Sequence, residues 1–118
     1  MADPAVDGAL LGVEVDDAAR YGRIDVDAGG RLVGFCEKQP GRGLINAGVY
    51  VFRRRLLARF PAVRPLSMEL DVFPALLAAG ANLRVATTRA PFLDIGTPES
   101  FAAAEAFVTR CCAAPAAA

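Results

Sequence analysis

The sequence contains no histidine and no tryptophan, and Lys38 is the only lysine among its 13 lysine and arginine residues. Without histidine, serine-histidine triads and histidine-based zinc sites are excluded, and a catalytic thiol would lack its usual base. The ligands that remain for a metal are carboxylates, which favour a hard ion such as Mg²⁺.

Cysteine is scarce as well. Cys36, Cys111 and Cys112 are odd in number and do not have the spacing of metal ligands. This pattern is typical of reduced thiols in a cytosolic protein.

Long apolar runs and clustered positive charge are also missing. No apolar run reaches the roughly 18 residues of a membrane span, and the N-terminus lacks the basic start of a signal peptide. The net charge is zero, and no basic run is interleaved with aromatic residues, so nucleic-acid binding has no support. We therefore expect a cytoplasmic protein that binds neither nucleic acid nor membranes.

The 118 residues are 54% hydrophobic and 22% charged, which predicts one folded domain or part of one. We expect a loose leader over residues 1–8, the domain over residues 9–112 and a disordered tail over residues 113–118. Periodicity predicts an α/β fold. The expected strands are Leu10–Val15, Arg23–Val26, Arg31–Lys38, Ile45–Phe52 and Asn82–Thr87.

Three helices are expected between and after these strands: Arg53–Phe60, a helix capped by Ser67 or Asp71 that ends near Ala79, and a helix from Thr97 to about Cys112. Their apolar stripes are predicted to be buried. The stripes consist of Leu56, Leu57 and Phe60 in the first helix, Leu70, Phe73, Leu76 and Leu77 in the second, and Phe101, Ala104, Val108 and Cys111 in the third.

The stretch from Phe35 to Phe52 is the centre of the chain, because two apolar strands there flank a loop rich in proline and glycine. Glu37, Lys38 and Asn46 lie where the strands meet the loop, a common place for small polar ligands in α/β folds. The only lysine suggests a site that needs a compact ammonium group. The alternative is a solvated hairpin pair, which is the usual role of exposed charges.

Three further features each have a structural and a functional interpretation, and two of them stay open. Gly22 either lets the backbone approach a ligand or is a plain turn glycine. Asp94, placed at the end of an apolar strand before Thr97, is either a metal ligand or a structural cap. Glu69 and Asp71 at the start of the second helix are interpreted as capping charges rather than catalytic groups.

Six motifs in this order resemble those of the sugar nucleotidyltransferases, and they cover most of residues 10–108. They are Arg20-Tyr21-Gly22, Asp27-x-x-Gly30, Phe35-x-Glu37-Lys38, Gly43-Leu-Ile-Asn46-Ala-Gly48-Val-Tyr50, Ser67-x-Glu69-x-Asp71-x-Phe73-Pro74 and Phe92-x-Asp94-Ile-Gly96-Thr97-Pro98-Glu99. The residues of the fourth and sixth motifs look closest to those of guanylyltransferases acting on heptose or mannose 1-phosphate. The resemblance implies a mixed β-sheet flanked by helices, the C-terminal half of a Rossmann-like nucleotide-diphospho-sugar transferase fold.

The resemblance also implies roles for individual residues. Gly22, Glu37, Lys38 and Asn46 would hold the sugar and its phosphate, and the same motif adds Gly48 to the substrate-binding set. Lys38 and Asp94 would be catalytic, with Asp94 as one of two aspartates that hold Mg²⁺. Such chemistry needs positioning and electrostatic stabilisation rather than a covalent nucleophile.

The sequence departs from the family pattern by lacking the Gly-rich nucleotide loop and the other metal aspartate. Two interpretations follow. The chain is either a transferase portion that uses a nucleoside triphosphate, GTP by resemblance, only when a complementing N-terminal half is present, or a non-catalytic remnant that binds sugar phosphate or serves in interactions. Homo-oligomer formation is compatible with both.

Overall fold

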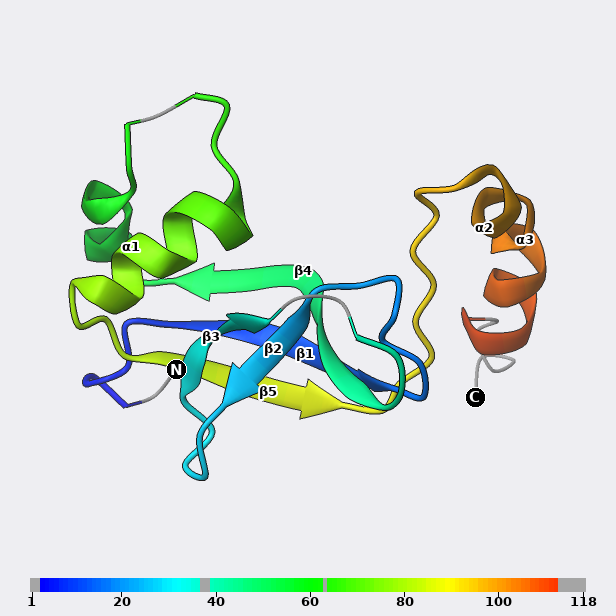
Figure 1. Ribbon diagram of the computed structural model, residues 1–118, viewed down its shortest axis with the longest axis horizontal. Coiled ribbons are helices and arrows are strands. Elements are labelled where there is room, and N and C mark those ends of the chain that lie inside the picture. Colours follow the sequence, from blue (N-terminus) through cyan, green and yellow to red (C-terminus); the bar gives the residue numbers. More distant parts are fainter. Residues whose placement is uncertain (1–2, 37–38, 63, 113–118) are drawn as a thin grey trace, which may run out of the picture.

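The computed structural model describes residues 3–36, 39–62 and 64–112. In the described part of the chain, four strands come first, followed by three short helical segments, a fifth strand and three more helical segments (Figure 1). The strands are β1 (Gly8–Val15), β2 (Arg23–Val26), β3 (Leu32–Cys36), β4 (Gly43–Phe52) and β5 (Leu83–Thr88). The helical segments are η1 (Arg54–Arg59), η2 (Met68–Val72), α1 (Phe73–Ala78), α2 (Pro98–Ala102), α3 (Ala104–Phe107) and η3 (Val108–Cys112).

The strands form one mixed sheet in the order β3-β2-β4-β1-β5, which confirms the predicted α/β fold with a mixed sheet. β1 pairs antiparallel with β4 and parallel with β5. Its sequence explains this interior place, because nearly continuous apolar residues suit a strand with neighbours on both edges and side chains packed on both faces.

The β2–β3 hairpin forms where the Asp27-Ala-Gly-Gly30 turn predicts it. The Asp27 carboxylate accepts hydrogen bonds from the backbone N–H groups of Gly29 (2.9 Å) and Arg31 (3.0 Å). The bond from Arg31 is the main reason that the pKa of Asp27 lies below its usual value. Gly30 has a φ of 83°, which favours glycine.

The tip of this hairpin also contacts the opposite edge of the sheet. The N–H of Val85 donates to the carbonyl of Gly30 (2.9 Å), and the Arg84 guanidinium donates to the carbonyl of Gly29 (2.6 Å). Because β2 pairs with β4 only through Arg23, the hairpin bends across one face of the sheet instead of extending it flat.

The main core lies on that face, between the hairpin, β1, β4, β5 and α1. The ring of Phe73 is fully buried at its centre, with centroids 5.3 Å from Phe35, 5.2 Å from Tyr50 and 6.0 Å from Phe52. The other buried members are Leu10, Ile24, Leu32, Leu56, Val72, Leu76, Ala81 and Leu83.

A second, smaller cluster packs around Val13, which points away from the main core because it is three residues from Leu10 in the same strand. Its buried members are Val13, Ala18 and Ile45, and Val15, Tyr21, Ala47 and Phe92 pack against it. This cluster fixes the 16–22 loop and the chain after β5 against the sheet.

Two leucines expected in apolar stripes are exposed instead. Leu57 is 53% exposed and Leu70 is 80% exposed. η1 is a 3₁₀ turn, whose tighter winding separates Leu57 from the buried Leu56. η2 contains wider turns, with a hydrogen bond from Val72 N–H to the Ser67 carbonyl (3.0 Å), and this wider winding moves Leu70 out of the stripe.

The beginning of the described chain is not loose, so the prediction of a loose leader is wrong for these residues. Val6 is buried. The guanidinium of Arg53 donates to the carbonyls of Val6 (2.6 Å) and Asp3 (2.8 Å). Asp7 accepts from the backbone N–H of Asn82 (2.7 Å) and pairs with Arg55 (2.9 Å).

The C-terminal helices α2, α3 and η3 lie apart from the sheet, connected to it by the 89–97 segment (Figure 1). Thr97 caps α2 with a capping box to Ser100, and Pro98 is in the first turn, as predicted. The predicted buried stripe is wrong: Phe101 is 67% exposed, Val108 is 55% exposed, and neither Ala104 nor Cys111 is buried. No other described element covers this stripe. None of the described helices is long and apolar enough to cross a membrane.

Candidate functional site

Asn46 and Gly48 lie at an irregularity of β4. The pairing with β1 shifts between Leu10, which faces Tyr50, and Gly12, which faces Asn46. Gly48 has a φ of 78°, and its N–H donates to Oδ1 of Asn46 (2.9 Å). A bulge of this kind re-aims a side chain. Here it turns the Asn46 amide toward Tyr50, which packs on the main core, and toward η2.

The nitrogen of the Asn46 amide connects two elements. Nδ2 is 2.7 Å from the hydroxyl oxygen of Tyr50 and donates to Oε1 of Glu69 (3.1 Å). Tyr50 is itself held by the ring of Phe73 in the main core. The amide is therefore fixed by the strand on one side and by η2 on the other.

Gly22 contacts the same carboxylate. A Cβ atom at Gly22 would lie 2.9 Å from Oε2 of Glu69, closer than van der Waals contact allows. The loop before β2 and the start of η2 therefore meet at Glu69. The structure brings Gly22 and Asn46 together through a residue that the sequence analysis had interpreted as a cap.

The two acidic residues of η2 have different roles. Asp71 does cap: its Oδ2 accepts from the N–H of Ser67 (2.8 Å), and the Ser67 hydroxyl accepts from the N–H of Leu70 (3.1 Å). Glu69 does not take part in this cap and extends to Asn46 instead. Only its alternation with Asp71 in the Ser-x-Glu-x-Asp motif could have indicated this.

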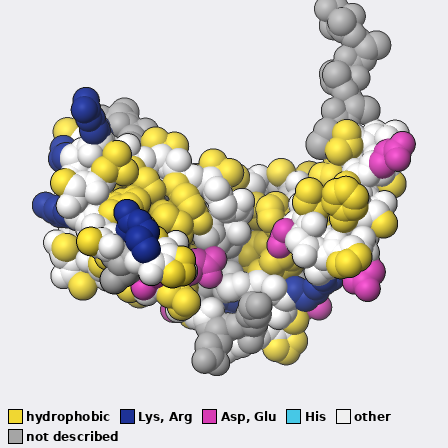
Figure 2. Space-filling view, turned by 90° about the horizontal axis from the view of Figure 1, so that it is seen from above, with side chains coloured by type: hydrophobic (Ala, Val, Ile, Leu, Met, Phe, Trp, Pro, Cys, Tyr) yellow, Lys and Arg dark blue, Asp and Glu magenta, His cyan; other side chains and the backbone are white. Residues whose placement is uncertain are grey.

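Asp94 lies across a cleft from the β4 bulge. The cleft has a volume of about 370 Å³ and is lined by Asn46, Ala47, Gly48, Phe92, Leu93, Asp94 and Ile95. Figure 2 shows the molecule hollowed between the body that holds α1 and the C-terminal helices, with apolar side chains on both sides. Three of the predicted site residues, Asn46, Gly48 and Asp94, therefore line one cleft, although Asn46 and Asp94 are 48 positions apart in sequence.

Asp94 was expected at the end of a strand. It lies instead in an irregular, exposed segment. Its Oδ1 accepts from the N–H of Gly96 (3.0 Å), which shapes the turn into α2, while Thr97 is the N-cap. The structural alternative for Asp94 is therefore a local turn and not a cap. Among the described residues, Oδ2 has no hydrogen-bond partner.

The described residues offer a metal only a limited ligand set. No group of three acidic or cysteine side chains that could hold a metal occurs among them. Mg²⁺ is usually bound by one or two carboxylates together with phosphate oxygens and water. Asp94 fits as one such ligand, and none of the other described residues that line this cleft is a carboxylate.

Glu37 and Lys38 lie outside the described residues. Arg23 holds the part of their loop that is described, donating to the side chain of Gln39 (3.2 Å) and the carbonyl of Arg42 (3.2 Å). Before the loop, a hydrogen bond with Asp25 is the main cause that raises the pKa of the Cys36 thiol. A thiol kept protonated is a poor nucleophile.

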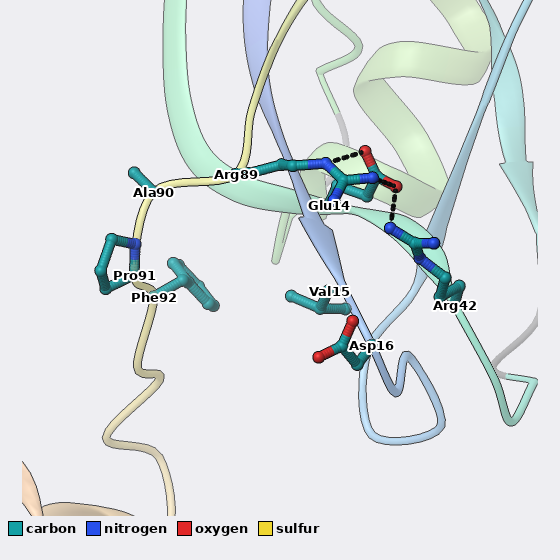
Figure 3. A pocket seen from close by; sticks show the side chains of 8 residues that line it. All are labelled: Glu14, Val15, Asp16, Arg42, Arg89, Ala90, Pro91 and Phe92. Atoms are coloured by element: carbon teal, nitrogen blue, oxygen red, sulfur yellow. Dashed lines mark hydrogen bonds and ion pairs between the residues drawn. The ribbon is translucent and has the colours of Figure 1, made fainter.

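A second cavity, of about 350 Å³, lies on the other side of Phe92 and is lined by Glu14, Val15, Asp16, Arg42, Arg89, Ala90, Pro91 and Phe92 (Figure 3). Glu14 accepts two hydrogen bonds from Arg89 (3.1 and 2.7 Å) and pairs with Arg42 (3.1 Å). These contacts fix the chain as it leaves β5. Phe92 follows, packed edge-on against Tyr21 at a centroid distance of 6.0 Å.

Comparison with known proteins identifies the family. A family model described as nucleotidyl transferase matches residues 2–110. The chain belongs to the nucleotidyl transferase family. The predicted resemblance to sugar nucleotidyltransferases is thereby confirmed.

Individual relatives within this family agree. The chain is 39% identical over 107 residues to mannose-1-phosphate guanylyltransferase of Mycobacterium tuberculosis, covering 88% of this chain and 30% of that protein. It is 31% identical over 101 residues to glucose-1-phosphate adenylyltransferase of Desulfitobacterium hafniense, covering 79% of this chain and 25% of that protein.

Among solved structures, this nucleotidyl transferase chain is similar to HddC from Yersinia pseudotuberculosis complexed with GMP-PN. The TM-score is 0.70 at 34% identity, covering 86% of this chain and 44% of HddC. The chain thus spans less than half the length of these relatives.

Proposed function

We propose that this chain is the sugar-phosphate-binding portion of a sugar 1-phosphate nucleotidyltransferase of the guanylyltransferase type. The observation that carries the proposal is that residues from separate motifs lie close together. Asn46 and Gly48 of β4 and Asp94 of the 89–97 segment face one cleft, and Gly22 reaches Asn46 through Glu69. These residues come from four separate motifs of the family resemblance.

The proposed reaction is nucleotidyl transfer. A phosphate oxygen of the sugar 1-phosphate attacks the α-phosphorus of the nucleoside triphosphate, the bond between the α-phosphorus and its bridging oxygen breaks, and pyrophosphate leaves. When bound, Mg²⁺ would supply positive charge that neutralises the triphosphate. Asp94 is the described residue suited to be one of its ligands.

In this proposal the chain positions the acceptor. The polar groups around Asn46 orient the sugar, the ammonium of Lys38 attracts the phosphate as a point charge, and Glu37 accepts from sugar hydroxyls. Because in-line transfer depends on positioning and electrostatics, a binding site fixed by a strand bulge and a packed core suits this role.

Ligand binding tests the proposal directly. Titrating the isotope-labelled chain with mannose 1-phosphate should shift the amide signals of Gly22, Asn46 and Gly48 in nuclear magnetic resonance spectra, and inorganic phosphate should not reproduce this pattern. If mannose 1-phosphate caused no more change at these amides than inorganic phosphate, the proposal would be wrong.

The non-catalytic alternative keeps the same binding site, and the missing Gly-rich loop favours it for the chain alone. A polypeptide carrying a Gly-rich nucleotide-binding half distinguishes the two. With GTP, Mg²⁺ and mannose 1-phosphate, the chain alone should release no pyrophosphate. Release on addition of that polypeptide would support the transferase portion, and continued inactivity would favour the remnant.

A further inference from the structure

The amide of Asn46 is almost fully used within the protein. Its two N–H bonds are directed to the Tyr50 hydroxyl and to Glu69, and Oδ1 accepts from the N–H of Gly48. The backbone N–H of Gly48 requires the amide oxygen, and the carboxylate of Glu69 requires the amide nitrogen, so the orientation of the Asn46 amide is fixed. Asn46 therefore has little capacity left to recognise a sugar.

Glu69 has that capacity. One oxygen of its half-buried carboxylate accepts from Asn46, and an ionised carboxylate has about four acceptor sites. Among the described residues, which include no lysine, no arginine forms an ion pair with Glu69, unlike Glu14 and Asp7. A half-buried carboxylate without a cation is stabilised by neutral donors. Hydroxyl groups of a ligand would supply them.

The identity of residue 22 agrees with this role. The φ of Gly22 is not positive, so backbone strain does not require glycine there. A Cβ at this position would lie 2.9 Å from Oε2 of Glu69, so a larger residue fits only if the end of the Glu69 side chain shifts. Glycine at this position leaves the carboxylate where Asn46 holds it.

We propose that Glu69 determines specificity for the sugar in this site, its carboxylate accepting hydrogen bonds from hydroxyl groups of the sugar ring. Asn46 and Gly22 are positioning residues that act through it. This inference rests on the proposed function. It also predicts the direction of the ligand, because the negative charge of Glu69 repels the phosphate and favours the hydroxyl-bearing end of the sugar.

The test is Glu69→Gln, with mannose 1-phosphate and inorganic phosphate as probes. Glutamine keeps the shape and replaces one acceptor oxygen by a donor. We expect about tenfold weaker binding of mannose 1-phosphate and unchanged binding of inorganic phosphate. Glu105→Gln on α3, exposed and outside the site, is the matched control and should bind both probes like the wild type.

Gly22→Ala provides an independent variant, since its methyl group must displace the carboxylate while Glu69 itself remains. It should weaken mannose 1-phosphate binding in the same way, and thermal unfolding of each variant verifies that the fold persists. If the wild type binds mannose 1-phosphate and Glu69→Gln binds it equally well, this inference alone is overturned. A wild-type chain that binds no mannose 1-phosphate would overturn the proposed function and this inference with it.

Discussion

Phe92 is the side chain that holds Asp94 against the sheet, so we expect its removal to act on both stability and the cleft. The 89–97 segment has no regular secondary structure. The ring of Phe92 packs against the cluster around Val13, edge-on to Tyr21. It also separates the cleft of Asp94 from the cavity of Glu14.

The expected cost of Phe92→Ala follows from this packing. A fully buried phenylalanine costs about 3–5 kcal/mol when truncated to alanine. The ring of Phe92 is half-buried and borders two cavities, so the cost of lost burial is about 1–2 kcal/mol. Loss of the contact with Tyr21 adds about 0.5–1 kcal/mol. We predict that the free energy of unfolding falls by about 2 kcal/mol.

The assay is urea unfolding at a concentration where sedimentation detects a single species. Phe101→Ala is the matched control, because the same atoms are removed from a side chain that is 67% exposed, and it should change stability by less than about 0.5 kcal/mol. Broadening by Mn²⁺ of the Asn46 and Gly48 amide signals reports on the position of Asp94 and should weaken only in Phe92→Ala. Equal effects of the two variants would refute the anchoring role.

Three further predictions concern the metal, pH and association. In a complemented form, Asp94→Asn should abolish pyrophosphate release while circular dichroism stays unchanged; activity within a few-fold of wild type would restrict Asp94 to its turn. The N–H of Asn82 and the guanidinium of Arg55 lower the pKa of Asp7 from 3.8. The ionised carboxylate therefore contributes to stability above that pH, and the contribution is lost as the pH falls through the lower pKa of the folded state. The stability difference between wild type and Asp7→Asn should shrink in acid, and a difference that is constant from pH 6 to about pH 2 would contradict this. The side chains of Val49 (55%) and Val51 (56%) on β4 are exposed and leave an apolar sheet surface that favours self-association. Sedimentation should therefore detect oligomers, and changing both valines to threonine should reduce them. A compact monomer for the unmodified chain would contradict this.

Local signals in the sequence predicted the fold well where one residue type decides the geometry. Asp27 and Gly30 specify the hairpin turn, and Thr97 with Pro98 specifies the start of α2. The apolar run of β1 predicts a strand covered on both faces. Each of these features depends on neighbours in the chain, so a pattern of a few residues is sufficient.

The wrong predictions have another physical cause, because they depend on how a helix winds or on contacts with residues distant in sequence. The widened turn of η2 exposes Leu70, although the spacing of apolar residues is that of an α-helix. Phe101 has an apolar helical pattern, yet no described element packs on it.

The candidate site was predictable only in part. Asn46 and Asp94 were predicted from their motifs, and the structure places them at one cleft. Glu69 was missed because a carboxylate in the first turn of a helix has the same sequence signature whether it caps the helix or extends to another element. Only the fold, which brings η2 beside β4, decides between the two.

The place of β1 between β4 and β5 has a consequence for the order of folding. β1 pairs in parallel with β5, and at their start Asp7 is bonded to Asn82, 75 residues further along. During synthesis, β1 can pair with β4 first, but its other edge stays without a partner until β5 has been made. Pairings this distant in sequence are closed late and slow the folding reaction. A nascent chain that stalls before Leu83 would therefore expose the open edge of β1, and an unpaired strand edge favours aggregation.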